Sequence, residues 1–147
     1  MKNGCFMVLE VQVSKSSFLI TIFSFIIFKE PNKIYTDEVG FDMRHSNQGM
    51  WGTGIYFAVN AQYSLSGYAF KNKERTRSIF YARVALGDDI ELPCNGSYKI
   101  PPEKQSTSGL FAVERYDSIK GNTGGSDIYI LYENSRAYPD YLITFEN

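Results

Sequence analysis

The chain has 147 residues, of which 44% are hydrophobic and 21% are charged, a balance typical of one globular domain and inconsistent with disorder throughout. Lysine and arginine number 15 against 16 aspartate and glutamate, and the net charge of −1 argues against a dedicated nucleic-acid-binding protein. Two cysteines and one histidine are too few for a disulfide framework or a zinc cluster, so we expect no metal site.

An apolar run near the amino terminus, residues 18–28 (FLITIFSFIIF), contains no charged residue. As a helix it would be roughly 16 Å long, about half of the ~30 Å needed to cross a bilayer. Its β-branched and aromatic residues favour a buried strand or a hydrophobic end-piece. A signal peptide or a membrane contact is one alternative, although no small-residue cleavage site follows the run. A segment foreign to the fold is another.

From residue 32 onward the sequence is typical of a compact domain. A loop rich in Gly, Asn and Asp is expected over residues 40–54, and a short strand over residues 54–58 leaves it. Asn60 is expected to cap a helix that continues to about residue 70, because its side-chain oxygen can accept a backbone N–H of the first turn. The charged stretch 71–77 is expected to be a solvated turn, with a basic ligand-binding patch as the alternative.

The carboxy-terminal part predicts strands separated by long loops. Alternating or continuous apolar patterns predict strands over residues 79–86, 110–116, 128–132 and 141–145. Three prolines with many Ser and Asn residues predict a long loop over 93–109, and the sequence KGNTGGS predicts a flexible loop over 120–126. We find no internal repeat and no second domain.

Two local patterns suggest where a ligand could bind. Gly52 and Gly54 lie directly before a strand, and glycines there let a ligand approach the main chain closely. Ser64 and Tyr68 lie at positions i and i+4 of the expected helix, so they share one face. A hydroxyl beside an aromatic ring suits a flat ligand ring that carries an amide. The alternative is that Tyr63, Ser64 and Tyr68 only pack the helix on a sheet.

Several motifs, in order, resemble the catalytic domain of the poly(ADP-ribose) polymerase family. They are the segments GFDMR (40–44), GMWGTGIYFA (49–58) and NAQYS (60–64), followed by RYDS (115–118), IYILY (128–132) and AYPDYLI (137–143). The resemblance covers residues 34–147. It implies an α+β ADP-ribosyltransferase fold, with two packed, mostly antiparallel sheets around an NAD+ cleft and one short helix after the strand 54–58.

The resemblance also implies roles for individual residues in binding NAD+, which is the family's substrate. Tyr56 matches the tyrosine that packs against the nicotinamide ribose, and Ser64 matches the serine that hydrogen-bonds the nicotinamide carboxamide. Tyr68 is the counterpart of the tyrosine that stacks on nicotinamide, although it lies one residue further along than expected. Arg44, in the donor loop 42–49, could reach the pyrophosphate or be a plain surface arginine. The main chain of Gly52 and Gly54 is expected at the cleft rim.

Ile128 occupies the place where polymerising members carry a glutamate on the third active-site strand. Isoleucine cannot accept the hydrogen bond of an acceptor hydroxyl, so the resemblance implies transfer of a single ADP-ribose to a protein acceptor. We expect the nearby acids Asp127 and Glu133 to be structural or solvated.

The family's catalytic domain opens with a His-Gly-Thr segment. Residues 21–39, where this segment would lie, contain neither histidine nor glycine. His45 lies on the other side of Gly40, inside the donor loop, and is not expected to replace that histidine.

These observations leave three hypotheses. The chain is an NAD+-dependent mono-ADP-ribosyltransferase, a catalytically dead relative that binds NAD+ or ADP-ribose, or a protein that uses residues 18–28 as an address or membrane contact. We expect an atypical hydrophobic segment over residues 1–33 and a partial catalytic domain over 34–147. No direct nucleic-acid binding is expected, and the resemblance implies an intracellular protein, cytoplasmic or nuclear.

Overall fold

The computed structural model describes residues 19–24, 31–105 and 113–146. The strands are β1 (Leu19–Ser24), β2 (Gln48–Gly49), β3 (Gly52–Thr53), β4 (Ile55–Ala58), β5 (Phe70–Lys71), β6 (Thr76–Ala85), β7 (Asp89–Glu91), β8 (Ser118–Thr123), β9 (Ser126–Leu131) and β10 (Ala137–Glu146). The helices are α1 (Pro31–Thr36), the short 3-10 helix η1 (Met43–His45) and α2 (Ala61–Gly67).

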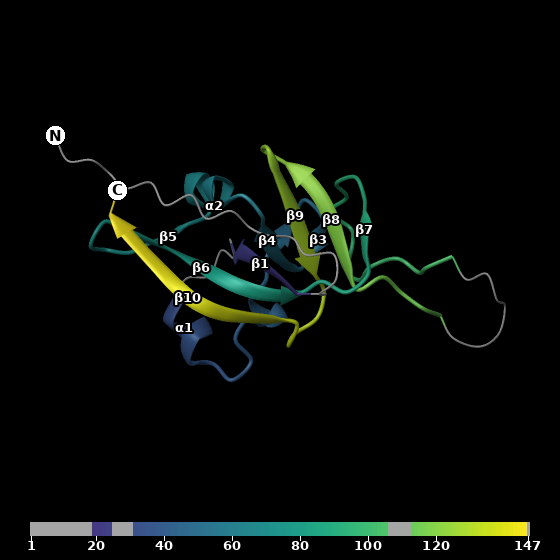
Figure 1. Cartoon of the computed structure of the whole chain (residues 1–147), viewed down its shortest axis with the longest axis horizontal. Coiled ribbons are helices and arrows are strands. Elements are labelled where there is room, and N and C mark those ends of the chain that lie inside the picture. The colour runs from purple at the N-terminus through teal and green to yellow at the C-terminus, as the bar shows by residue number, and fades with distance from the viewer. Residues whose placement is uncertain (1–18, 25–30, 106–112, 147) are drawn as a thin grey trace.

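The described strands confirm the predicted α+β class with mostly antiparallel pairing. Eight strands form one sheet in the order β10-β6-β1-β4-β9-β8-β7, with β5 also paired to β6, while β2 and β3 form a separate hairpin. Within the described residues only the β7–β8 ladder is parallel. The β6–β10 and β8–β9 pairs run in clearly different directions (Figure 1). The two sheets expected from the sequence are therefore two parts of one hydrogen-bonded sheet.

β1 joins the two parts of the sheet. It pairs with β6 along all six of its residues, but with β4 only through Phe23–Ala58 and Ser24–Phe57. Part of the apolar run 18–28 is thus a strand, as its β-branched composition favours, and the rest of that run lies outside the described residues. No helix in the described part of the chain is long and apolar enough to cross a membrane.

The alternation of β4 and β9 divides the core into two clusters on opposite faces of these strands. Ile55 and Phe57 of β4 pack in one cluster with Ile34 of α1. Tyr56 and Ala58 pack in the other, against which Tyr63 of α2 is packed. α1 and α2 therefore cover opposite faces of the sheet, and the second face is the one that carries the candidate site.

α2 forms where the sequence predicts it and for the predicted reason. Asn60 has extended backbone angles, and its side chain accepts the N–H of Gln62 at 2.9 Å. The helix ends at Gly67, three residues earlier than expected, and Tyr68 follows as its carboxy-terminal cap. The expected turn 71–77 is shorter than predicted, because β5 and β6 extend into it.

The predicted flexible loop over residues 120–126 is wrong, because most of it belongs to the hairpin β8–β9. Six cross-strand pairs hold β8 against β9, and only Gly124 and Gly125, with φ of +57° and +76°, form the turn. Gly121 is buried in β8 because the Trp51 indole packs on it, and a Cβ there would lie 2.1 Å from the ring. The glycines that suggested a loop are required by a tertiary contact and a tight turn.

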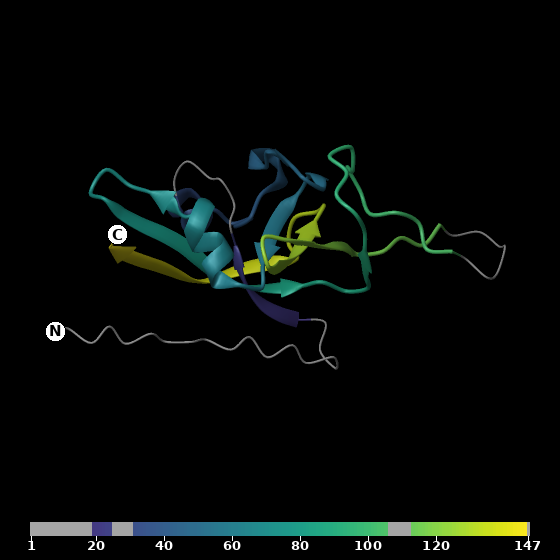
Figure 2. The same cartoon turned by 90° about the horizontal axis from the view of Figure 1, so that it is seen from above.

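The long loop expected over residues 93–109 contains no strand in its described part, residues 93–105. The strand predicted over 110–116 is not found among residues 113–116, which contribute only an isolated bridge between Arg115 and Glu103, and residues 110–112 lie outside the description. The described parts of this connection project away from the sheet (Figures 1 and 2).

Candidate NAD+ site

A cavity of about 240 Å³ opens on the face of β4 and β9 that is covered by α2. It is lined by Ser46, Asn47, Gln48, Gly49, Met50, Trp51, Gly54, Tyr56, Tyr63, Tyr68 and Ile128. The lining comes from the segment 46–54, from the strands β4 and β9, and from Tyr63 and Tyr68 in and directly after α2. Four of the residues proposed from sequence, Gly54, Tyr56, Tyr68 and Ile128, are thereby brought together, whereas Arg44, Gly52 and Ser64 are not among the described residues of this lining.

Tyr56 points its phenol at the main chain of the segment before β4. The hydroxyl accepts the N–H of Trp51 at 2.9 Å and donates to the carbonyl oxygen of Gly52 at 2.7 Å. Burial raises the pKa of Tyr56 to about 12, so the phenol is neutral near pH 7. Tyr56 consequently both lines the cavity and fixes the turn beside it.

Tyr63 and Tyr68 form an aromatic pair in the cavity wall. Their ring centroids are 5.2 Å apart with an angle of 30° between the planes, and their hydroxyl oxygens are 3.2 Å apart. Burial, with the neighbouring Tyr68 hydroxyl, raises the pKa of Tyr63 to about 12. The sequence alone predicts only a packing role for Tyr63. The sequence signal for Tyr63 is its position five residues before Tyr68. The two rings meet in the cavity wall because α2 ends at Gly67, between them.

Ser64 is completely buried in α2, with an exposed fraction of 0%. Its Oγ has no hydrogen-bond partner among the described residues. The i, i+4 relation to Tyr68 holds along the backbone, since the N–H of Tyr68 donates to the carbonyl oxygen of Ser64 at 3.1 Å. The Ser64 hydroxyl is therefore a buried polar group without a partner next to the tyrosine pair, and its role towards a carboxamide stays a prediction.

The glycines before β4 are needed for contacts within the protein. Gly52 has φ of +81°, and a Cβ there would lie 1.7 Å from the carbonyl oxygen of Tyr98. A Cβ on Gly54 would lie 2.4 Å from the side chain of Ile130. A Cβ on Gly49 would lie 2.7 Å from the Tyr56 hydroxyl oxygen. These close approaches explain the glycines by contacts within the protein. Contact of a ligand with the main chain of Gly52 and Gly54 stays a prediction.

Arg44 lies in η1 and is held by Asp42. Its Nε donates to Oδ2 of Asp42 at 2.7 Å, and its Nη2 is 2.5 Å from the same oxygen. The Arg44 side chain is 75% exposed, while Asp42 is 1% exposed. The hydrogen bonds from the Arg44 guanidinium and backbone N–H hold the pKa of the Asp42 carboxyl well below its usual range. Binding of pyrophosphate by Arg44 stays a prediction, as does the surface alternative.

Ile128 is fully buried, and it pairs with Ala58 of β4. On the other side of β4, Phe23 of β1 pairs with the same Ala58. The three strands that would carry the family's active-site positions are thus neighbours in the order β1-β4-β9. The middle strand carries Tyr56, the third carries Ile128, and β1 (Leu19–Ser24) contains no histidine.

The remaining acids and the histidine do not belong to the cavity lining. Asp127 accepts a hydrogen bond from Asn122 at 2.7 Å and lies 3.1 Å from the Lys120 ammonium, while Glu133 pairs with Arg136. His45 is in η1, which precedes the lining segment. The described residues contain no group of three or more His, Cys, Asp or Glu side chains that could hold a metal ion.

Comparison with known proteins identifies the family of this chain. Residues 38–147 match the poly(ADP-ribose) polymerase catalytic domain family, and the chain belongs to that family. A probable poly [ADP-ribose] polymerase of Dictyostelium discoideum is 36% identical over 139 residues, which cover 92% of this chain and 36% of the relative. At that coverage the match includes part of residues 1–33.

Two human relatives have names that specify the type of transfer. Protein mono-ADP-ribosyltransferase PARP14 is 33% identical over 100 residues, which cover 67% of this chain and 5% of the relative. Protein mono-ADP-ribosyltransferase PARP12 is 33% identical over 95 residues, which cover 65% of this chain and 12% of the relative. This chain thus spans about a third or less of the length of these relatives.

Proposed function

We propose that this chain forms the NAD+-binding domain of a mono-ADP-ribosyltransferase, which moves one ADP-ribose from NAD+ to a protein side chain. The observation that carries the proposal is the cavity in which Tyr56, the Tyr63–Tyr68 pair and the apolar Ile128 meet. Membership of the family and the names of the two human relatives support the type of transfer.

The residues around the cavity suit the nicotinamide end of NAD+. Tyr68, supported by Tyr63, offers an aromatic surface for a flat ring, and such stacking contributes about 1–3 kcal/mol per ring. Ser64 lies in α2 outside the lining, and its hydroxyl is fully buried without a partner among the described residues, so a hydrogen bond from it to a carboxamide requires α2 to shift when NAD+ binds. Tyr56 supplies the apolar ring edge beside the ribose, and its hydroxyl keeps the neighbouring turn in place.

The reaction would be a substitution at the anomeric carbon of the nicotinamide ribose. The bond from that carbon to the nicotinamide nitrogen breaks, and its electron pair leaves with neutral nicotinamide. A new bond forms to the acceptor atom, which loses a proton. Positioning and electrostatic support of a cation-like transition state dominate such chemistry, so a preformed cavity is the main contribution of the protein.

Ile128 leads us to expect transfer of a single unit. Chain elongation would require an acceptor for the hydroxyl proton of the bound ADP-ribose, and a buried isoleucine offers none. After incubation with labelled NAD+, a gel should show a discrete modified band. A ladder or smear of long polymers would contradict the proposal.

A catalytically dead relative that binds NAD+ or ADP-ribose is the second candidate, and one observation favours it. β1 lies beside β4, where the family carries its histidine strand, but contains no histidine. Misplacement of a substrate by about 1 Å can reduce the rate on the order of a hundredfold. We therefore expect this chain to release nicotinamide at least about a hundredfold more slowly than a member with the complete His-Gly-Thr segment.

Two measurements on the purified full chain separate the candidates. Calorimetric titration with NAD+ tests binding, and chromatographic detection of nicotinamide tests turnover. Binding with measurable transfer supports a transferase, and binding without release supports the dead relative. Release at a rate comparable with the complete family member would show that the missing histidine is dispensable, and His45→Ala would then test the one histidine of the chain. Absence of NAD+ binding would contradict the transferase, and absence of binding to both NAD+ and ADP-ribose would contradict both candidates. An intracellular location, cytoplasmic or nuclear, is proposed with this function.

A further inference from the structure

The cavity wall formed by residues 46–51 follows a partly buried cluster of hydrogen bonds around Asp42. Oδ1 of Asn134, in the loop after β9, accepts the N–H of Met43 at 2.8 Å, and its Nδ2 donates to Asp42 at 3.3 Å. Asp42 also accepts the N–H of Arg44 at 2.9 Å, which caps η1. Asn134 thereby fixes the start of the wall, although it lies 91 positions from Met43 and 92 from Asp42 in the sequence.

The other end of the same wall is held by a residue two positions before Asn134. The hydroxyl of Tyr132 donates to the carbonyl oxygen of Trp51. The Trp51 N–H in turn donates to Tyr56, and the Trp51 indole N–H donates to Leu92 at 2.9 Å. Tyr132 and Asn134 both follow directly after β9, the strand that carries Ile128.

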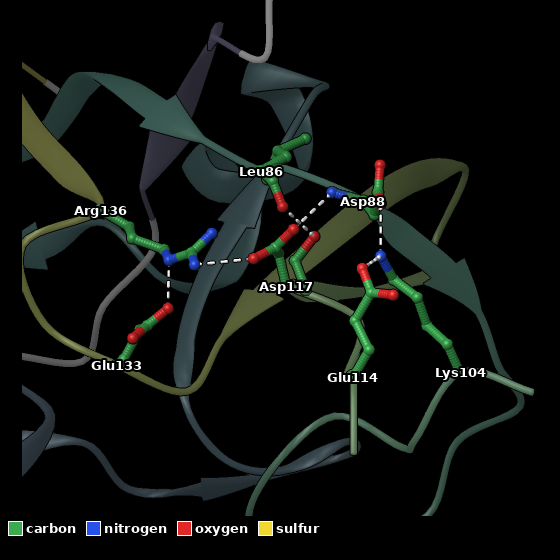
Figure 3. A network of polar contacts seen from close by, with 8 residues as sticks. Leu86, Asp88, Lys104, Glu114, Asp117, Glu133 and Arg136 are labelled. Atoms are coloured by element: carbon green, nitrogen blue, oxygen red, sulfur yellow. Dashed lines mark hydrogen bonds and ion pairs between the residues drawn. The ribbon is translucent and has the colours of Figure 1, made fainter. Parts of the chain in front are cut away.

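The loop that carries these two residues is itself anchored. Arg136 lies 2.7 Å from Oδ1 of Asp117 and also contacts Glu133, while Oδ2 of Asp117 accepts the N–H of Asp88 at 2.8 Å (Figure 3). Lys104 extends the same network to Glu114. The loop 132–136 is thus connected to the base of the long connection between β7 and β8, and it can hold another segment in place.

We propose that Tyr132 and Asn134 are positioning residues, which hold segment 42–51 in the conformation that forms the cavity wall and so set the affinity for NAD+. The part concerning NAD+ rests on the proposed function. Neither side chain touches the reacting atoms; each acts through the backbone of the wall. The strand that carries Ile128 therefore also aligns the opposite side of the cavity, because its continuation holds both ends of that segment.

Limited trypsin digestion tests whether Asn134 and Tyr132 fix the conformation of segment 42–51, since cleavage of a folded protein requires local opening of the segment around the bond. Asn134→Ala should speed cleavage after Arg44 at least about fivefold, in line with the loss of two hydrogen bonds. Asn72→Ala is a matched control, because the Asn72 side chain also makes two hydrogen bonds, accepting the backbone N–H groups of Glu74 at 2.9 Å and Thr76 at 3.0 Å. It should speed cleavage after Arg75 and leave the bond after Arg44 unchanged. Tyr132→Phe should also speed cleavage after Arg44, but by a smaller factor than Asn134→Ala.

Calorimetric titration with NAD+ tests the consequence. Asn134→Ala should raise the Kd at least about fivefold, while Asn72→Ala, with a comparable loss of thermal stability, should leave it unchanged. Unchanged cleavage after Arg44 in Asn134→Ala would overturn the proposal. Faster cleavage with an unchanged Kd would overturn the positioning role. Failure of the unmodified chain to bind NAD+ would contradict the proposed function, and the cleavage after Arg44 would then decide alone whether Asn134 holds the segment.

Discussion

The strands under the cavity and the segment beside it are stabilised in different ways. We call β4 and β9 the strand side, and residues 42–54 the loop side. On the strand side, Phe57, Ile128 and Ile130 are each 0% exposed, and the stabilisation is the burial of apolar surface. On the loop side, individual hydrogen bonds, one buried carboxylate and glycines with close neighbours define the shape. The difference indicates that stability and ligand affinity can be changed separately.

The largest expected effect is on the strand side, at the face away from the cavity. Phe57 packs edge-on against Phe41 with ring centroids 5.5 Å apart. Phe57→Ala should lower the free energy of unfolding by about 3–5 kcal/mol, because it leaves a cavity in the core. Urea denaturation measures this change. The Kd for NAD+, measured where the variant is still folded, should stay within about twofold of the original. A strongly raised Kd in the folded variant would contradict the separation of the two sides.

Gly52→Ala should disturb the loop side next most strongly. The substitution combines a left-handed backbone with a collision against the Tyr98 carbonyl oxygen, so the free energy of unfolding should fall by at least about 2 kcal/mol, and NAD+ affinity should fall as well. Gly67→Ala is the control, because its Cβ would meet no described atom within 4 Å at the end of α2. It should be neutral or stabilise by up to about 1 kcal/mol. Equal thermal stability of the two variants would contradict this account.

Asp42 should make the loop side sensitive to acid. Its pKa in the folded protein lies below the ordinary 3.8, because Arg44 and Asn134 hydrogen-bond the carboxylate. The stabilisation is therefore complete above about pH 4 and is lost as the pH falls through the lowered value. Urea denaturation between pH 2 and pH 7 should show a smaller acid-induced loss of stability for Asp42→Asn than for the unmodified chain. The same pH dependence in both would show that the Asp42 carboxylate is not coupled to folding.

The smallest expected change in stability is at Ser64, where the affinity for NAD+ should fall without a loss of stability. Ser64→Ala removes a buried hydroxyl with no partner among the described residues, so it should leave stability unchanged or raise it by about 1 kcal/mol while weakening NAD+ binding. Ser118→Ala is the matched control, because this serine is equally buried but donates to the Leu86 carbonyl at 3.0 Å. It should destabilise by about 1–3 kcal/mol. Unchanged NAD+ affinity in Ser64→Ala would contradict the expected role of this serine.

The sequence alone predicted the elements whose signals are local. β4 and β9 have continuous apolar patterns, and α2 has its capping residue Asn60 at the expected place. These signals are carried by neighbouring residues, so they survive whatever the rest of the chain does. The order of the motifs also predicted the family. Tyr56, Tyr68 and Ile128 line one cavity, whereas Ser64 does not, and the roles of all four towards NAD+ stay predictions.

Contacts between distant residues decided the rest. The loop predicted over β8 is wrong, because Gly121 is a glycine for the sake of the Trp51 indole that packs on it and not for a turn. That contact cannot be read from the neighbouring sequence. The close approach of the Tyr98 carbonyl oxygen to Gly52 explains this glycine, and no residue near Gly52 in the sequence predicts that contact. Asn134 and Met43 are 91 positions apart, and one hydrogen bond between such residues leaves no periodic pattern. The sequence therefore determined β4, β9, α2 and the family, through local periodicity and motif order. Only the tertiary structure determined the shape of the cavity wall, because long-range polar contacts and close backbone approaches define it.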